Sequence, residues 1–184
     1  MHPLETVYKT TVVPGLKEKF GYTNIYQTPK ILKVSINVGL GRALKDPSYL
    51  EVVADSLEKI TGQKPVKTRA KKSIAGFKIR EGQVVGMKVT LRKQRMMDFV
   101  SKLLSFALPR VRDFRGLDSK AIDARGSLTI GFKENIAFPE VKSDEIEKVH
   151  GLEVTITTNA KSREEGMALF TLYGFPFKKP PTKS

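Results

Sequence analysis

Hydrophobic residues recur along the chain in two periods that predict two kinds of element. Strict alternation of apolar and polar residues predicts strands, and apolar residues three or four positions apart predict helices. The stretches with alternation are 30–38, 66–69, 84–92, 127–132 and 152–157. The stretches with helical spacing are 4–20, 46–61, 94–108 and 162–173, with one more short helix expected over 143–149.

The ends of the expected helices are set by prolines, glycines and capping residues. Pro14 lacks the amide hydrogen that a helix interior needs, so it should kink or split the first helix. Gly21 should end that helix, and Pro109 should stop the helix over 94–108. Ser162 followed by Glu165 predicts a capping box for the last helix. The first helix is expected to bury Leu4, Val7, Tyr8, Leu16 and Phe20.

The polar positions of the expected strands form a pattern of their own. An antiparallel sheet with helices on one side would collect them on its open face. Short hydroxyl and amide groups among cations suit the sugar-phosphate backbone and shallow minor groove of paired RNA. They are also ordinary residues for a wet sheet face, since threonine favours strands. The outward positions are Lys33, Ser35, Asn37, Lys88, Thr90, Arg92, Ser127, Thr129, Thr155 and Thr157.

Positive charge is concentrated in one stretch. The 184 residues include 33 lysines and arginines and 19 acids, a net charge of +14. Residues 62–95 hold eleven of the cations and a single acid, Glu81, so this segment carries +10 and the rest of the chain +4. A local field of this kind suits a polyanion, because neutralised phosphates release condensed counterions. The alternative is a solvated basic loop, the usual role of a charge run.

Two stretches lack a regular period. Residues 71–83 are expected to form a long basic loop between two strands, with Phe77 set among cations, where it could also fill the protein's own core. An ordered loop of this length is more often functional than decorative. Residues 110–126 are the second such stretch, and they begin a surface excursion that is expected over 110–147. Residues 180–184 are expected to be a flexible tail after a single domain over 1–179.

Composition and motifs argue against several classes of function. The chain has no cysteine, so disulfides and thiolate metal sites are excluded. We find no apolar run near the roughly 20 residues that span a bilayer, and no signal-peptide pattern. The Gly39–Leu44 stretch lacks the third glycine of a dinucleotide loop. His2 and His150 show no metal-ligand spacing, and His150 is expected in a turn. No enzyme, metal or cofactor is expected.

Long stretches of the chain resemble a known family. They are Val34–Gly41, Thr61–Ile74, Lys88–Arg92, Leu108–Gly116 and Gly174–Lys178. Together they are similar to the bacterial L-five family of large-subunit ribosomal proteins, in consistent order from about residue 4 to 179. One departure is Ala75–Gly76, where the family pattern would lead us to expect Ser-Asn.

The resemblance implies a fold, a location and a set of partners. The fold would be α+β, with a curved antiparallel sheet backed on one side by helices, in a ferredoxin- or RRM-like arrangement with insertions. The partners would be 5S rRNA, 23S rRNA, P-site tRNA, small-subunit protein S-thirteen and neighbouring large-subunit proteins, in the central protuberance of a cytoplasmic ribosome. No membrane and no homo-oligomer are expected.

These implications assign residues to three surfaces. The expected 5S rRNA contacts are Lys33, Asn37, Gln63, Lys64, Thr68, Lys88, Thr90 and Arg92. The expected tRNA-binding loop, which we expect to be mobile in the isolated protein, contributes Lys71, Lys72, Ser73, Phe77, Lys78 and Arg80. The expected intersubunit and rRNA surface contains Arg110, Arg112 and Arg115. The alternative is a protein-protein scaffold without direct 5S rRNA binding. A phosphate-substrate enzyme is less favoured than the scaffold, and an anionic-membrane binder would need an amphipathic basic helix with exposed bulky apolar residues, which we do not find.

Overall fold

The computed structural model describes residues 2–41, 48–141 and 149–178. Residues 1–34, 92–130 and 155–184 belong to one compact unit, unit 1, and residues 35–91 and 131–154 to a second, unit 2. Four expected features lie outside the described residues: the helix start at Asp46–Pro47, all but the last residue of the short helix over 143–149, the tail 180–184 and half of the Gly39–Leu44 stretch.

Five strands form an open antiparallel sheet in the order β2-β3-β1-β5-β4. They are β1 (Ile31–Gly39), β2 (Val66–Arg69), β3 (Val84–Leu91), β4 (Leu128–Phe132) and β5 (Leu152–Thr158). The α+β class and all five expected strands are thereby confirmed. The expectation of a single domain over 1–179 stays a prediction.

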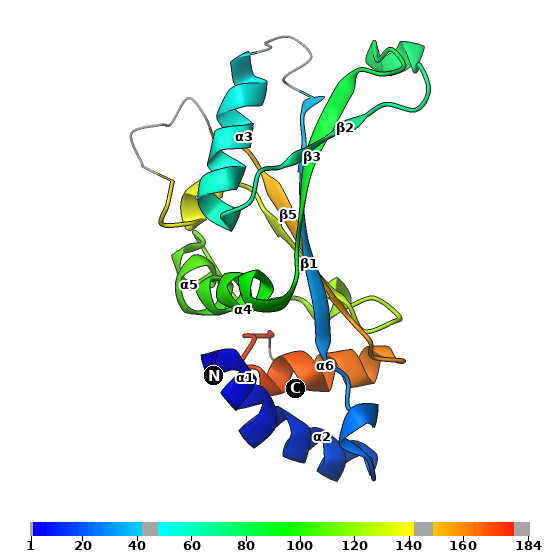
Figure 1. The fold of residues 1–184 in the computed structure, drawn as a ribbon, viewed down its shortest axis with the longest axis vertical. Helices are drawn as coiled ribbons and strands as arrows, with labels where there is room; N and C mark the ends of the chain where they lie inside the picture. The colour runs from blue at the N-terminus through cyan, green and yellow to red at the C-terminus, as the bar shows by residue number, and fades with distance from the viewer. Residues whose placement is uncertain (1, 42–47, 142–148, 179–184) are drawn as a thin grey trace, which may run out of the picture. The chain divides into compact units, whose positions relative to one another are not determined.

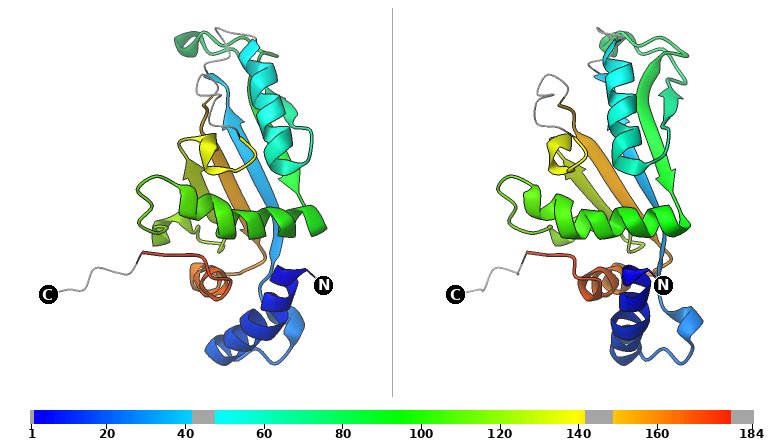
Figure 2. Two further views of the ribbon diagram at one scale, coloured as in Figure 1. Left: turned by 90° about the vertical axis from the view of Figure 1, so that its left-hand side faces the viewer. Right: turned by 60° about the vertical axis from the view of Figure 1, so that its left-hand side comes forward.

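Unit 1 contains two long helical segments and the C-terminal helix. The first segment is α1 (Pro3–Val7), the π turn η1 (Tyr8–Val12) and α2 (Val13–Phe20); the second is α4 (Lys93–Lys102), the π turn η5 (Leu103–Ala107) and α5 (Leu108–Arg110). The C-terminal helix α6 (Arg163–Leu172) packs against α2 and η1, as Figure 2 shows. Short 3-10 turns cover Ile25–Gln27 (η2) and Ser119–Ala121 (η6).

Each of the two long helical segments has an internal proline just after its π turn. Pro14 and Pro109 each follow the last residue of the π turn by two positions, in the first turn of the next α-helix. A proline ring clashes with the carbonyl four residues earlier, and here that carbonyl belongs to the wider π turn. The helices therefore continue to Phe20 and Arg110, and the prediction that Pro109 stops the second helix is wrong.

The π turn also changes which residues of the first helix are buried. Val12 and Val13 are buried with Leu4 and Leu16, whereas Val7, Tyr8 and Phe20 are only half-buried. A π turn inserts an extra residue into the helical period, so the apolar stripe shifts after it. The expected burial of Leu4 and Leu16 is confirmed.

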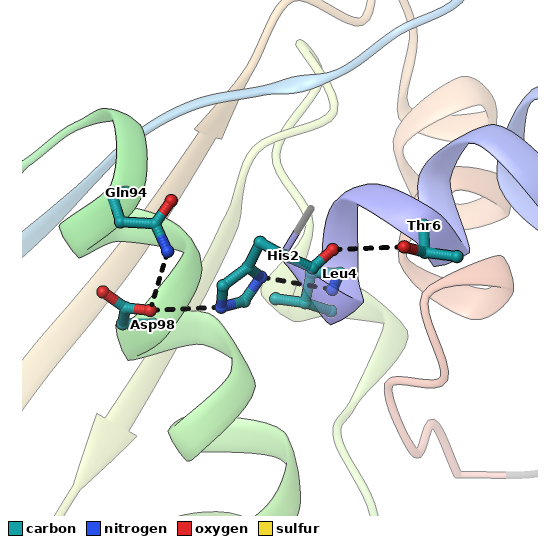
Figure 3. Close-up of polar contacts among 5 residues, drawn as sticks. All are labelled: His2, Leu4, Thr6, Gln94 and Asp98. Carbon is teal, nitrogen blue, oxygen red and sulfur yellow. Dashed lines mark hydrogen bonds and ion pairs between the residues drawn. The ribbon is translucent and has the colours of Figure 1, made fainter.

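The start of α1 is tied to α4 through His2, as Figure 3 shows. The ring nitrogen Nδ1 accepts a hydrogen bond from the amide of Leu4 at 3.2 Å, which caps the helix. The other ring nitrogen, Nε2, lies 3.1 Å from Asp98 Oδ1, which also accepts from Gln94 Nε2 at 3.2 Å. His2 thus has a structural role at a helix start.

Unit 2 holds the helix α3 (Ser48–Thr61) against β3 and carries the short turns η4 (Ala75–Phe77) and η7 (Asn135–Ala137). A buried polar cluster joins α3 to η7. Asn135 Nδ2 lies 3.1 Å from Ser56 Oγ and 3.2 Å from His150 Nδ1. His150, which was expected in a turn, is 4% exposed, and its ring satisfies a buried amide.

Several strand positions differ from strict alternation. Leu32 is exposed and Ile31 is buried, so the alternation in β1 begins only at Val34. Ser127, which was expected to face outward, is buried, and so is Gly86. The Ser127 hydroxyl accepts from the amide of Thr158 at 3.4 Å and so joins the packing inside unit 1.

Candidate nucleic-acid interface

The pairing of β2 with β3 places polar side chains on one face of unit 2. The two strands are antiparallel, and Val66 is paired with Lys88 and Thr68 with Gly86. Directly paired residues share a face of the sheet, so Thr68 and Lys88 lie on the same side. Met87 and Val89 are buried on the opposite side. Neither strand contains an acid, which leaves this face positively charged.

Gly86 leaves the middle of that face without a side chain. A Cβ atom there would lie 2.8 Å from the Thr68 hydroxyl and 3.0 Å from the carbonyl oxygen of Val38. The Thr68 side chain therefore sits over the backbone of β3 and covers Gly86. This close approach explains why Gly86 is buried although it faces outward. A larger residue at this position would push the Thr68 side chain away from the β3 backbone.

Further polar groups of unit 2 lie on β1, on β3 and in the connection between α3 and β2. Gln63 follows α3 and donates through Nε2 to the carbonyl of Thr90 at 3.4 Å. Asn37, on β1, is exposed, as are Lys64 and Lys88. These amides, hydroxyls and ammonium groups are the donors that RNA backbones accept. We call Asn37, Gln63, Lys64, Thr68, Lys88 and Thr90 the polar face of unit 2.

Two of the expected 5S rRNA contacts belong to unit 1. Lys33 is half-buried near the start of β1, and Arg92 is exposed immediately before α4. An apolar residue of unit 2 that alternation did not single out, Val66, is 68% exposed and is paired with Lys88. Its exposure follows from the strand register, because Val66 shares the open face of the sheet with Lys88, and the sequence pattern does not encode that pairing.

The basic loop continues the hairpin of β2 and β3 beyond the strands, as Figure 1 shows. We call residues 70–83 the hairpin tip. Ala70 donates to the carbonyl of Gln83 at 2.8 Å and accepts from the amide of Gly82 at 2.9 Å. Farther out, Ile74 and Ile79 exchange two hydrogen bonds, of 2.9 and 3.2 Å. The tip thus has a folded backbone of its own.

The side chains of the hairpin tip point mainly to solvent. Phe77 is 71% exposed, so the alternative in which it fills the protein's own core is wrong for this structure. Lys71, Lys72, Lys78 and Arg80 are exposed as well. Ser73 already has a structural partner, because its Oγ accepts from the amide of Glu81 at 2.9 Å.

The first part of the expected surface excursion is anchored to unit 1. Arg110, Arg112 and Arg115 are exposed, as a binding surface requires. The next residues turn inward, with Leu117 and Ile122 7% and 2% exposed. The amide of Leu117 donates to the carbonyl of Pro176 at 2.7 Å, and its carbonyl accepts from the amide of Lys178 at 2.9 Å.

The described residues give no sign of metal chemistry or of a membrane span. No group of three or more histidine, cysteine or acidic side chains could hold a metal ion within 2–41, 48–141 and 149–178. In the same ranges, no helix has the length and apolar content needed to cross a bilayer.

Comparison with known proteins identifies the family. The family model of ribosomal protein L5 matches residues 24–80, and the model of the C-terminus of the same ribosomal family matches residues 84–177. The large ribosomal subunit protein uL5 of Colwellia psychrerythraea is 50% identical over 179 residues, 97% of this chain and 99% of that protein. The chain belongs to the uL5 family. The uL5 proteins of Desulfatibacillum aliphaticivorans (53% identity, 97% of this chain and 100% of that protein) and Gloeothece citriformis (52%, 96% and 98%) are similar to it.

Membership of the uL5 family makes this a ribosomal protein of the large subunit, part of the ribonucleoprotein that carries out translation. The family is one of structural ribosomal proteins and is not a class of enzymes. The two family models meet between residues 80 and 84, inside the hairpin tip. Because β2 and β3 pair across that point, the boundary between the models does not separate two structural units.

Proposed function

We propose that the polar face of unit 2 binds paired 5S rRNA and helps to attach it to the large subunit. Asn37, Gln63, Thr68 and Thr90 would contact the backbone and minor groove, while Lys64 and Lys88 neutralise phosphates. Lys33 and Arg92 of unit 1 would add contacts to the same RNA. The observation that supports this most strongly is the strand register that puts Thr68 and Lys88 on one acid-free face.

Filter binding to 5S rRNA over a series of salt concentrations tests this proposal. Asn37→Ala combined with Thr90→Ala should weaken binding by about tenfold or more, since hydrogen bonds to charged groups contribute about 1.5–3 kcal/mol each. The salt slope should stay unchanged. Lys88→Ala should instead reduce the slope by about one unit, because one phosphate contact is lost.

The matched control for Lys88 is Lys59, an α3 lysine whose ammonium lies 2.7 Å from Asp55. Lys59→Ala should leave the slope as it is in the wild type. If the double variant at Asn37 and Thr90 binds 5S rRNA like the wild type, the polar face is not part of the RNA interface. Binding that ignores both nuclease and salt would favour the alternative, a protein-protein scaffold without direct 5S rRNA contact.

We further propose that the hairpin tip contacts P-site tRNA in the assembled ribosome. The exposed cations of the tip suit a phosphate backbone, and Phe77 presents an aromatic ring that RNA can pack against. Phe77→Ala should leave 5S rRNA binding intact and impair translation by ribosomes that carry it. Phe106, 57% exposed in unit 1, provides the matched control, and Phe106→Ala should not affect translation through tRNA.

The third proposed surface lies within 110–147 and would meet 23S rRNA and small-subunit protein S-thirteen. Three of its cations, Arg110, Arg112 and Arg115, are exposed on an anchored segment. Arg112→Glu with Arg115→Glu should weaken the association of the two ribosomal subunits while 5S rRNA binding is retained. Sedimentation of subunits at several magnesium concentrations measures this effect, and an unchanged profile would rule out these arginines.

A further inference from the structure

Tyr26 is an exposed aromatic residue that none of the proposed surfaces uses. It lies in the turn η2 of unit 1 and is 88% exposed, and its neighbour Ile25 is 54% exposed. Aromatic rings normally bury much of their surface, and displayed ones are typical of binding sites. We call residues 24–30 the Tyr26 turn.

Hydrogen bonds hold the backbone of the Tyr26 turn in place. The side chain of Asn24 accepts from the amide of Tyr26 at 3.0 Å, and the carbonyl of Asn24 accepts from the amide of Gln27 at 3.1 Å. Thr28 is buried, and its hydroxyl lies 3.1 Å from the hydroxyl of Tyr8 in the first helical segment. The ring is therefore displayed by an anchored backbone.

The far end of the turn is anchored to the residue that follows β5. Lys30 donates from its amide to Asn159 Oδ1 at 2.6 Å, and its carbonyl accepts from the amide of Asn159 at 3.2 Å. A ligand that packs on Tyr26 would consequently meet a preorganised ring and would order little additional chain.

The charges near the turn in sequence indicate the class of ligand. Residues 17–33 contain four lysines, at 17, 19, 30 and 33, and one acid, Glu18, which gives +3. Lysine is depleted in the cores of protein-protein interfaces. An aromatic ring beside a cationic backbone track is instead the arrangement with which proteins bind unpaired nucleotides. We propose that the Tyr26 turn stacks on an unpaired base of ribosomal RNA.

This site would be distinct from the polar face of unit 2, which is proposed to bind paired RNA by shape. The chain contains no tryptophan, so Tyr26→Trp places a single fluorescent reporter at the turn. Titration with a single-stranded 12-nucleotide RNA should quench this fluorescence saturably, and a 12-base-pair RNA duplex should quench it far less. Thr171→Trp, on the exposed surface of α6, is the control and should show no such difference.

Affinity measurements complete the test. Tyr26→Ala should weaken binding to the single strand by about 5- to 100-fold, the loss expected for one base–aromatic stack, and leave duplex binding unchanged. Tyr26→Phe should bind like the wild type, because stacking needs the ring and not the hydroxyl. Equal binding by Tyr26→Ala, or a loss with Tyr26→Phe as large as with alanine, would overturn the proposal.

Two further outcomes separate this site from the others. The Asn37→Ala, Thr90→Ala double variant should retain the quenching of the tryptophan reporter at the turn even though it loses paired 5S rRNA. Loss of that quenching would mean that the single-stranded RNA binds at the polar face, and it would overturn the proposal that the Tyr26 turn is a separate site. A Tyr26→Ala protein that binds all RNAs normally but fails to bind a purified large-subunit protein would reassign the turn to a protein contact.

Discussion

The hairpin tip (70–83) and the segment 110–127 are two long connections without a hydrophobic period, yet they differ in burial and in hydrogen bonding. Segment 110–127 buries Leu117 and Ile122 and is joined to the C-terminal residues by backbone hydrogen bonds. In the hairpin tip, Ile74 and Phe77 stay exposed, and the outer backbone is held by hydrogen bonds within the tip itself. Segment 110–127 contributes to the core of unit 1, whereas no residue of the hairpin tip is buried.

The largest expected effect is the loss of stability when a glycine of segment 110–127 is replaced by alanine. Gly126 has a φ of +73°, and a Cβ there would lie 2.6 Å from Ala160 Cβ and 2.8 Å from Ser162 O. Gly126→Ala should therefore destabilise the protein by roughly 4 kcal/mol or more, combining backbone strain with overpacking. Urea denaturation measures the change in the free energy of unfolding.

The hairpin tip supplies a matched control for this variant. Gly82 has a φ of +79°, but a Cβ atom added there would have no atom within 4 Å, so only the backbone penalty applies. Gly82→Ala should cost about 1–2 kcal/mol. If both variants lost the same stability, close packing of segment 110–127 against α6 would not be what holds it in place.

A second comparison concerns large apolar side chains. Ile122 is 2% exposed, so Ile122→Ala should lower the free energy of unfolding by about 2–4 kcal/mol through lost burial and a cavity. Phe77→Ala should change it by less than about 0.5 kcal/mol, as for most surface substitutions. Thermal and urea denaturation of the two variants check this. A large loss with Phe77→Ala would mean that its ring packs on the protein in solution.

Sequence patterns predicted the strands better than they distinguished these two connections. Alternation marked Val34, Ile36 and Val38 correctly because one face of β1 is buried. The π turns before the two helix prolines could not be read from the sequence, since they depend on how each proline is accommodated by its own helix. The buried state of Leu117 depends on Pro176, about sixty residues away, and no local period encodes such a contact.

The binding surfaces were predictable to the extent that they rest on charge. The cations of 62–95 are visible as composition, and the exposure of Lys88 is as expected. The display of Tyr26 was not predicted, because η2 is too short to show a period and its exposure follows from the hydrogen bonds that hold the turn. Ser127 was misassigned because its contact with Thr158 overrides alternation.

Alkaline pH should destabilise unit 1 through two of its tyrosines, a residue type that the hairpin tip does not contain. Burial, with a smaller effect of the nearby Glu165 carboxylate, raises the pKa of Tyr22 from 10.0 to about 12. Burial, and then Tyr8, also raises the pKa of Tyr173. The folded state favours the neutral phenols. Their contribution to the free energy of unfolding is therefore complete below pH 10 and is lost as pH rises toward 12.

Denaturation between about pH 9 and 12 tests this expectation. The free energy of unfolding should fall across the interval, and the fall should be shallower in a Tyr22→Phe, Tyr173→Phe double variant. The difference between the two proteins carries the test, because it isolates the two phenols from every other effect of alkaline pH. Identical slopes would show that these two phenols do not contribute.

The smallest expected effect concerns the internal order of the hairpin tip. Ser73 Oγ accepts from the amide of Glu81 at 2.9 Å, so Ser73→Ala removes one bond that holds the tip closed. At this exposed site the free energy of unfolding should change by less than about 1 kcal/mol. The local consequence is sharper, because the Glu81 amide loses its acceptor and should exchange with solvent faster, as hydrogen exchange followed by NMR would measure.

Asp123 gives the matched change in segment 110–127, because its Oδ1 accepts from the amides of Arg125 and Ser127 at 2.9 and 2.8 Å. Asp123→Ala should raise the hydrogen-exchange rates of these two amides less than Ser73→Ala raises the rate of the Glu81 amide. The reason is that the packing of the buried segment around them still holds the chain there. An unchanged exchange rate at Glu81 would mean that the tip is already open in solution and that Ser73 is available to bind RNA.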